Sequence, residues 1–186
     1  MKKISIISLI IVLILSISGC NKENDLWYGE VEGNKYINKK FSFEMDIPDE
    51  WKVKEDIENM NEEVNNLEDL EEVTICIMSS KFSNQGIKVD KHLVIGEGMS
   101  IRVINKDEKI NDYIDKVYNI DFGDDSANIQ NIETKDVNGK EFTIIEFKNN
   151  IVYLIKIENK IFDFNTVYLN DSQKEIIRAM NSIKFK

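Results

Sequence analysis

The chain has 186 residues, enough for one domain and a short appendage. It carries 24 Lys and Arg against 34 Asp and Glu, a formal net charge of −10. Phosphate binding needs Lys and Arg clustered on one face, so this balance argues against a nucleic-acid partner. Two cysteines are too few for a disulfide-stapled scaffold or a cysteine-based zinc site.

The N-terminal residues have the order of a bacterial export signal. Met1–Lys3 is a short basic segment, and Ile4–Ile17 is apolar apart from its serines. The apolar stretch is shorter than the roughly 20 residues that a permanent transmembrane helix needs. Residues 1–19 are therefore predicted to be a signal peptide and are left out of reasoning about the fold.

The signal ends in Ile17, Ser18, Gly19 and Cys20. This run resembles the lipobox of bacterial lipoproteins, in which an aliphatic residue and two small residues precede an invariant cysteine. The resemblance implies cleavage before Cys20 and a diacylglyceryl group, with acyl chains such as palmitate, on its thiol. Two acyl chains matter because one gives only marginal membrane binding. The alternatives are an uncleaved membrane anchor and an ordinary signal that Cys20 follows by chance.

The lipobox predicts a protein of the bacterial cell envelope, lipid-anchored on the extracytoplasmic face of the cell membrane. Residues 20–35 are predicted to be the lipid anchor and a polar tether, and residues 36–186 one folded domain. Trp27 and Tyr28 interrupt the tether. They have three interpretations: docking on the domain, insertion at the membrane interface, or partner binding. We adopt docking.

The first half of the domain contains strands and one acidic helix. Residues 41–47 alternate apolar and polar side chains, the period of a half-buried strand. Apolar residues spaced by three and four across 57–67 predict an amphipathic helix. The apolar run 73–78 predicts a central strand buried on both faces. Residues 83–98 contain three glycines and predict a loop, with at most a short strand around 93–95.

The second half predicts a strand at 99–104, a helix at 110–117 and a weak strand at 129–137. Asn138-Gly139 follows as a type I′ hairpin turn, because that turn needs positive φ at both central residues. A meander of three strands comes next, over 141–147, 151–157 and 161–169.

The last predicted helix begins at a sequence that fits a capping box, Ser172 with Glu175. Its apolar face is formed by Ile176, Ile177, Met180 and Ile183.

The stretch from Tyr36 to Val53 is similar to the start of a PsbP-like domain, and Phe43, Ile47, Pro48 and Trp51 carry the motif. The resemblance covers residues 36–185. It implies an α+β fold in which an antiparallel β-sheet is packed with helices, a PsbP-like α/β sandwich. Plant and cyanobacterial members assist photosystem II, a role not carried over here. No metal ligand of the family can be matched, so no cofactor is predicted.

Few residues have the chemistry of a catalytic or metal site. His92 is the only histidine, so any nucleophile–histidine pair must include it, and it lies in a polar stretch expected at the surface. Cys76 lies among apolar residues and is expected to be buried. Asp121, Asp124 and Asp125 could offer oxygen ligands to calcium, but they lack EF-hand spacing and are expected in a solvated loop. No catalytic or metal-binding residue is predicted.

The aromatic residues have two interpretations. Phe162, Phe164 and Tyr168 share one face of a predicted strand, either in the core or along a ligand groove, and the core is expected. Trp51 is likewise expected to anchor the core.

These observations predict a non-catalytic binding or accessory module that meets an unknown envelope protein. One alternative is a small-ligand-binding lipoprotein with a groove between sheet and helices. Another is a hydrolase built on paired carboxylates. A deep apolar pocket would favour the small ligand, and a flat exposed apolar patch would favour the protein partner.

Overall fold

The structure is a computed structural model that describes residues 27–55, 57, 67–80, 97–118, 128–168 and 172–186, together with the backbone of 87–89 and 92–94. The predicted signal peptide, the lipobox with Cys20 and nearly all of the predicted helix at 57–67 lie outside these residues. So do Asp121, Asp124 and Asp125.

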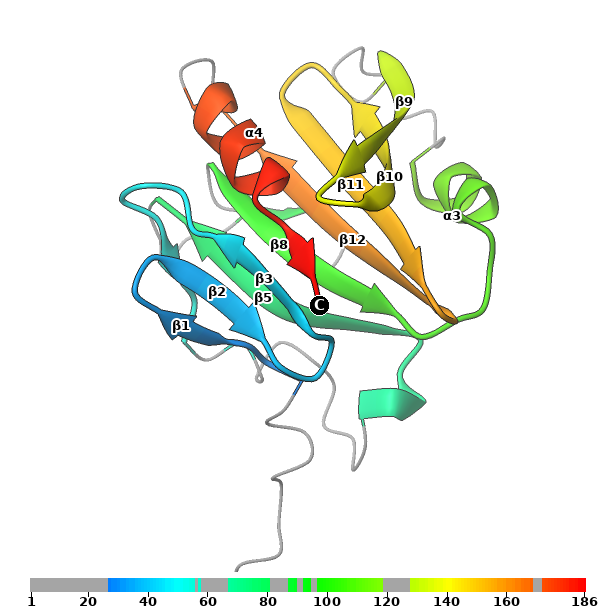
Figure 1. The fold of residues 1–186 in the computed structure, drawn as a ribbon. Coiled ribbons are helices and arrows are strands. Elements are labelled where there is room, and N and C mark those ends of the chain that lie inside the picture. The colour runs from blue at the N-terminus through cyan, green and yellow to red at the C-terminus, as the bar shows by residue number, and fades with distance from the viewer. Residues whose placement is uncertain are drawn as a thin grey trace, which may run out of the picture.

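A seven-stranded antiparallel sheet forms the centre of the molecule, in the order β4-β5-β8-β12-β11-β10-β9 (Figure 1). Its strands are β4 (Lys52–Val53), β5 (Glu72–Ser79), β8 (Gly98–Ile104), β9 (Asn131–Val137), β10 (Lys140–Glu146), β11 (Asn150–Ile157) and β12 (Lys160–Val167). The predicted meander is confirmed. So is the hairpin turn, where Asn138 and Gly139 have φ values of 52° and 83°.

A second sheet of four strands, in the order β1-β2-β3-β13, packs on one face of the large sheet (Figure 1). It consists of β1 (Glu30–Glu32), β2 (Lys35–Asn38), β3 (Phe43–Asp46) and β13 (Lys184–Phe185). The folded part therefore begins before the predicted boundary at Tyr36, because β1 pairs with β2 across a tight turn.

The large sheet is covered on both faces. Ile151, Tyr153 and Ile155 of β11 join a core shared with the small sheet and with α4 (Gln173–Asn181). Val152 and Leu154 join a separate core under α3 (Ile110–Val117). The side chains of β11 therefore alternate between two cores. Strands rather than helices cover much of one face, so the helical layer is thinner than predicted.

Two short elements complete the described part of the chain. A 3₁₀ turn, η2, spans Leu67–Asp69. The predicted loop at 83–98 contains a hairpin of β6 (Ile87–Val89) and β7 (His92–Val94).

The capping box predicted for α4 is wrong. Ser172 has helical backbone angles, φ −93° and ψ −9°, and makes no side-chain cap hydrogen bond. Its hydroxyl donates instead to Glu97 Oε1 at 2.5 Å. Glu175 Oε1 accepts from the backbone N–H of Asp49 at 2.6 Å. Both side chains fix the start of α4 to distant parts of the fold.

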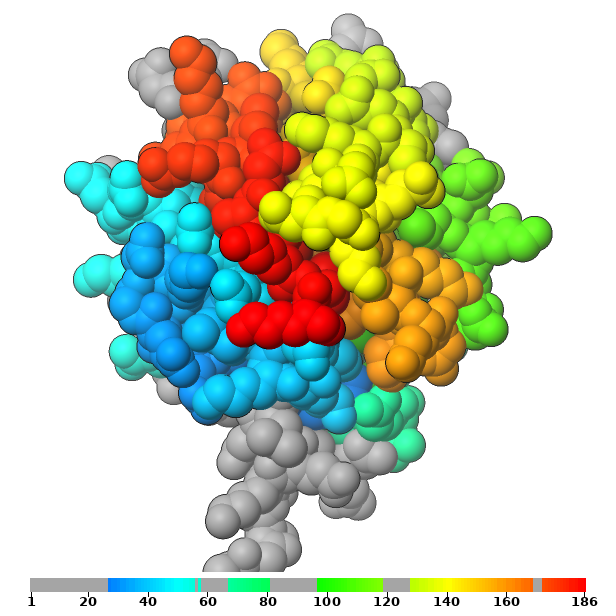
Figure 2. Space-filling model, viewed as in Figure 1, coloured from blue at the N-terminus to red at the C-terminus, as the bar shows by residue number. Residues whose placement is uncertain are grey.

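The C-terminal segment lies between the two sheets' outer strands. In the space-filling view it runs between β1–β3, blue and cyan, and the yellow β9–β10 hairpin (Figure 2). Lys184 and Phe185 pair there with Glu44 and Phe43 of β3.

Candidate functional site

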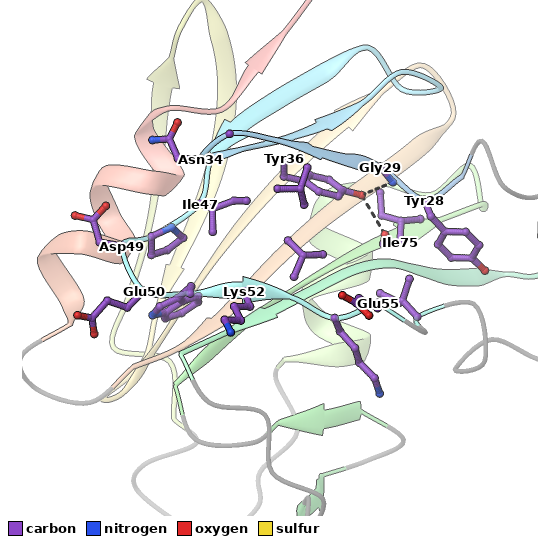
Figure 3. A pocket seen from close by; sticks show the side chains of 17 residues that line it. Tyr28, Gly29, Asn34, Tyr36, Ile47, Asp49, Glu50, Lys52, Glu55 and Ile75 are labelled. Atoms are coloured by element: carbon purple, nitrogen blue, oxygen red, sulfur yellow. Dashed lines mark hydrogen bonds between the residues drawn. The ribbon is translucent and has the colours of Figure 1, made fainter.

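A groove of about 730 Å³ lies between one edge of the small sheet, at β1 and β2, and one edge of the large sheet, at β4 and β5 (Figure 3). Val31, Ile47 and Trp51 are among the apolar residues that line it. The small-ligand alternative placed a groove between sheet and helices, whereas this groove lies between two sheets. The sequence analysis did not predict β1 or the four-stranded sheet that forms one of its walls.

Tyr36 forms the floor of this groove. It is almost wholly buried, and its hydroxyl donates to the backbone carbonyl of Ile75 at 3.0 Å (Figure 3). The same oxygen accepts the backbone N–H of Gly29 at 3.0 Å. Burial raises the pKa of Tyr36 well above its ordinary value, so the phenol stays protonated and serves as a structural link rather than a base.

Gly29 is required by the close approach of the Tyr36 ring. A Cβ atom at this position would lie 2.4 Å from Cζ of Tyr36 and 2.7 Å from the carbonyl oxygen of Ile37. Only glycine lets the chain pass this close to the floor of the groove.

Trp51 belongs both to the core and to the wall of the groove. It is 8% exposed and packs in the core shared by the two sheets, as predicted. Ile47 and Pro48, which precede it in the PsbP-like motif, also line the groove. Sequence reasoning placed Trp51 in the core and Ile47 on a half-buried strand, and it assigned neither to a groove, because nothing local marks one.

Charged residues line the groove as well. Asp49, Glu50, Lys52 and Glu55 are exposed, and Lys54 is half-buried. The residues that line it in the described part of the chain include no Ser, Thr, Cys or His. Among all described residues, no group of three or more His, Cys, Asp and Glu is arranged to hold a metal ion. The groove offers apolar contact and charge, the chemistry of binding.

A buried ionic cluster lies beneath α3, away from the groove. Arg102 on β8 donates to Asp163 Oδ2 on β12 at 2.5 Å. Tyr113 and Tyr118 donate to the same oxygen at 2.7 and 2.6 Å. Asp163 has no exposed surface, so these donors replace its water and fasten α3 to the sheet. The sequence analysis did not predict this cluster, although an acidic residue between Phe162 and Phe164 indicates a buried charge.

The other predicted residues lie apart from the groove. Cys76 is completely buried, as expected, and burial raises the pKa of its thiol. Phe162, Phe164 and Tyr168 are in the core, as expected. His92 lies on β7, and its side chain is outside what the structure describes.

Trp27 docks on the domain, as predicted. It is 1% exposed, and its carbonyl oxygen accepts a hydrogen bond from Nδ2 of Asn38 at 2.8 Å. The Lys40 ammonium lies 4.6 Å from its ring centroid, within cation–π range. Tyr28, the next residue, lines the groove. Both residues predicted in the tether therefore belong to the folded domain.

Within the described ranges, none of the helices has the length and apolar character needed to cross a membrane. Comparison with protein-family models finds no match, and neither does comparison with curated proteins.

A solved structure shares the fold. The solution structure of cyanobacterial PsbP (CyanoP) from Synechocystis sp. PCC 6803 aligns with a TM-score of 0.51 and 13% sequence identity. The alignment covers 85% of this chain and 98% of that one. Identity this low carries information on the fold alone. The chain therefore has a PsbP-like fold, in agreement with the motif at Phe43, Ile47, Pro48 and Trp51.

Proposed function

We propose that this protein is a lipid-anchored extracytoplasmic lipoprotein whose domain is a non-catalytic binding module. The groove between β1 and β4 holds the partner. The observation that carries this proposal is the composition of the groove: apolar residues such as Val31, Ile47 and Trp51 line it together with charged residues, most of them exposed.

The absence of catalysis is supported by the residues around the groove. The phenol of Tyr36 is engaged at the floor and stays protonated. A carboxylate mechanism needs two acids facing each other across a cleft, one of them with a raised pKa. Asp49, Glu50 and Glu55 are exposed at the rim, where water solvates them.

The lipid anchor is supported by the lipobox at Ile17–Cys20. Because Trp27 is fixed in the fold, the chain from Cys20 to Trp27 reaches at most about 25 Å when fully extended. An anchored domain would thus work close to the membrane surface, within reach of membrane proteins and their exposed segments.

The anchor is tested by replacing Cys20 with Ser and labelling cells with a fatty-acid probe before fractionation. Wild-type protein is expected to take up the label and to sediment with membranes, whereas Cys20→Ser should do neither. A labelled, membrane-bound Cys20→Ser protein would contradict the lipoprotein assignment.

The groove is tested by cross-linking in intact cells, purification and mass spectrometry. Val31→Glu places a charge on the groove wall, and Ile132→Glu places the same charge on β9, which is similarly exposed. A bound protein lost only with Val31→Glu supports the proposal. A small molecule lost in the same pattern would favour the ligand-binding alternative.

The hydrolase alternative is tested with glycan, ester, peptide and phosphoester substrates, with and without divalent metals. We expect no turnover. Turnover abolished by Glu50→Gln or by Glu55→Gln would show that the rim carboxylates are catalytic and would overturn the binding-module proposal.

A further inference from the structure

β1 is the edge strand of the small sheet, and its middle residue, Val31, lines the groove. The β1–β2 hairpin turns through Gly33 and Asn34, and Gly33 has φ +65°, so Glu32 and Lys35 flank a two-residue turn. The two residues that flank such a turn form a hydrogen-bonded pair, in which each accepts from the other's N–H. Along an antiparallel pair of strands, hydrogen-bonded pairs alternate with pairs whose N–H and C=O groups point outward. Val31, opposite Tyr36, therefore directs its N–H and C=O away from β2.

Strand β4, on the opposite wall of the groove, also has a residue whose backbone N–H and C=O point away from its neighbouring strand. The backbone N–H of Lys54 donates to the carbonyl of Ile77 at 2.8 Å, so these two residues form a hydrogen-bonded pair with β5. Val53, one residue earlier and opposite Met78, directs its N–H and C=O away from β5. Val31 and Val53 both line the groove. The groove is thus bounded by two sheet edges whose backbone groups point outward.

We propose that the groove takes an extended peptide segment of a partner protein, which adds to β1 as a further strand beside Val31. This inference rests on the proposed function and names the chemistry of the partner. Strand addition matches an edge with outward backbone groups, because main-chain hydrogen bonds supply affinity and alternate side chains enter the groove.

The side chains of β1 indicate the sequence of this peptide. Val31 is 51% exposed and lines the groove, whereas Glu30 and Glu32 lie on the other face of the strand. Opposite Glu30 and Glu32, the added strand is favoured by Lys or Arg, because opposite charges on neighbouring strands attract. Opposite Val31, it is favoured by an apolar residue. The peptide therefore alternates basic and apolar residues.

Glu30 already forms a salt bridge with Lys39, in which Lys39 Nζ lies 2.7 Å from Glu30 Oε2. Both side chains are more than half exposed, and pairs of this kind contribute little and exchange readily. A basic residue of the incoming peptide can replace Lys39 at small cost. The groove that Val31 lines is also lined by Glu50 and Glu55, which add negative charge beside it (Figure 3).

The far edge of the large sheet provides a matched control. Ile132 on β9 lies opposite Ile145, and counting from the turn at Asn138-Gly139 places it at a position whose backbone groups also point outward. Ile132 is 48% exposed, close to the value for Val31, but it is not among the residues that line the groove.

The test uses the full-length protein in detergent and a capped heptapeptide that alternates lysine and valine. Two control peptides carry glutamate in place of lysine, or methyl groups on the amide nitrogens. Val31→Pro removes the outward N–H without removing a bond to β2, an edge position where proline is tolerated. Ile132→Pro does the same on β9. Binding is measured by calorimetry, and the Val31 amide is followed by hydrogen exchange.

The lysine–valine peptide is expected to bind wild type and Ile132→Pro equally, and to slow exchange of the Val31 amide. Val31→Pro and the glutamate peptide should each bind about tenfold more weakly, and the N-methylated peptide should not bind. If Val31→Pro does not fold, as judged by circular dichroism, the double variant Glu30→Lys, Glu32→Lys is used and should give the same weakening.

Equal binding by Val31→Pro, or by the N-methylated peptide, would overturn strand addition at β1. If the peptide does not bind while the cellular partner is still lost with Val31→Glu, the peptide inference fails and the binding-module proposal stands. If neither depends on Val31, both fail.

Discussion

The Tyr36 hydroxyl donates to the carbonyl of Ile75 at 3.0 Å and thereby joins the small sheet to the large one at the floor of the groove. The donor, Tyr36, is on β2 of the small sheet, and the acceptor, Ile75, is on β5 of the large sheet. The same hydroxyl accepts the N–H of Gly29, just before β1. One side chain therefore fixes the spacing between the two walls.

Removing this hydroxyl should destabilise the fold without changing its shape. Tyr36→Phe leaves the Ile75 carbonyl and the Gly29 amide without their partner, and we expect a loss of about 1–3 kcal/mol in the free energy of unfolding. Chemical denaturation measures it. The control is Tyr168→Phe, whose hydroxyl only accepts from Gln173 near the surface. Equal losses would contradict the linking role of Tyr36.

Asp163→Asn should be the most destabilising polar substitution in the domain. It removes the buried carboxylate charge that pairs with Arg102 and accepts from Tyr113 and Tyr118. Glu72 stays 3.1 Å from Arg102, so we expect a loss of about 3 kcal/mol, the lower end of the cost of breaking a buried ion pair. Asp107→Asn is the control, because the exposed pair of Asp107 with Lys156 should contribute less than about 1 kcal/mol. Denaturant titrations of both variants decide whether α3 depends on this cluster.

Acid should weaken the attachment of the C-terminal strand to β3. Hydrogen bonds from Lys186 and Lys35 lower the pKa of Glu44 to about 2, from an ordinary value of 4.5. A carboxyl with a lowered folded pKa contributes stability above pH 4.5 and loses it as pH falls toward 2. Glu44→Gln should flatten the pH dependence of the unfolding midpoint in that window. An unchanged slope would contradict the pairing.

Trp51→Ala should reduce the free energy of unfolding by about 3–5 kcal/mol, since it empties a buried aromatic site. Urea denaturation followed by tyrosine fluorescence measures the loss. Val31→Ala, at an exposed position beside the same groove, should change stability by less than about 0.5 kcal/mol. A loss below about 1 kcal/mol for Trp51→Ala would mean that the ring is available for binding rather than packing.

The elements that could be predicted have a repeating signal of their own. Residues 151–155 are a continuous apolar run, which is typical of a strand buried on both faces, and their side chains alternate between two cores. Asn138-Gly139 marks a turn through the backbone angles that it tolerates. β1 and β13 were missed because neither has such a signal: Glu30–Glu32 is exposed throughout, and Lys184–Phe185 is two residues long.

The groove could not be predicted because it is made by tertiary structure. Ile47 and Trp51 have the pattern of core residues, and they are core residues. They line a groove because the fold places the edge strand β1 beside them. The capping box failed for a related reason, since Glu97 and Asp49 lie far from Ser172 and Glu175 in the sequence and outcompete the local partners.

β3 gains its second neighbour only from β13, where Phe185 lies opposite Phe43. The rings of Phe43, Phe162 and Phe185 contact one another, so this aromatic centre closes only when all three are present. A chain leaving a ribosome delivers Phe43 early and Phe185 much later. This aromatic centre therefore cannot form until residue 185 has been synthesised.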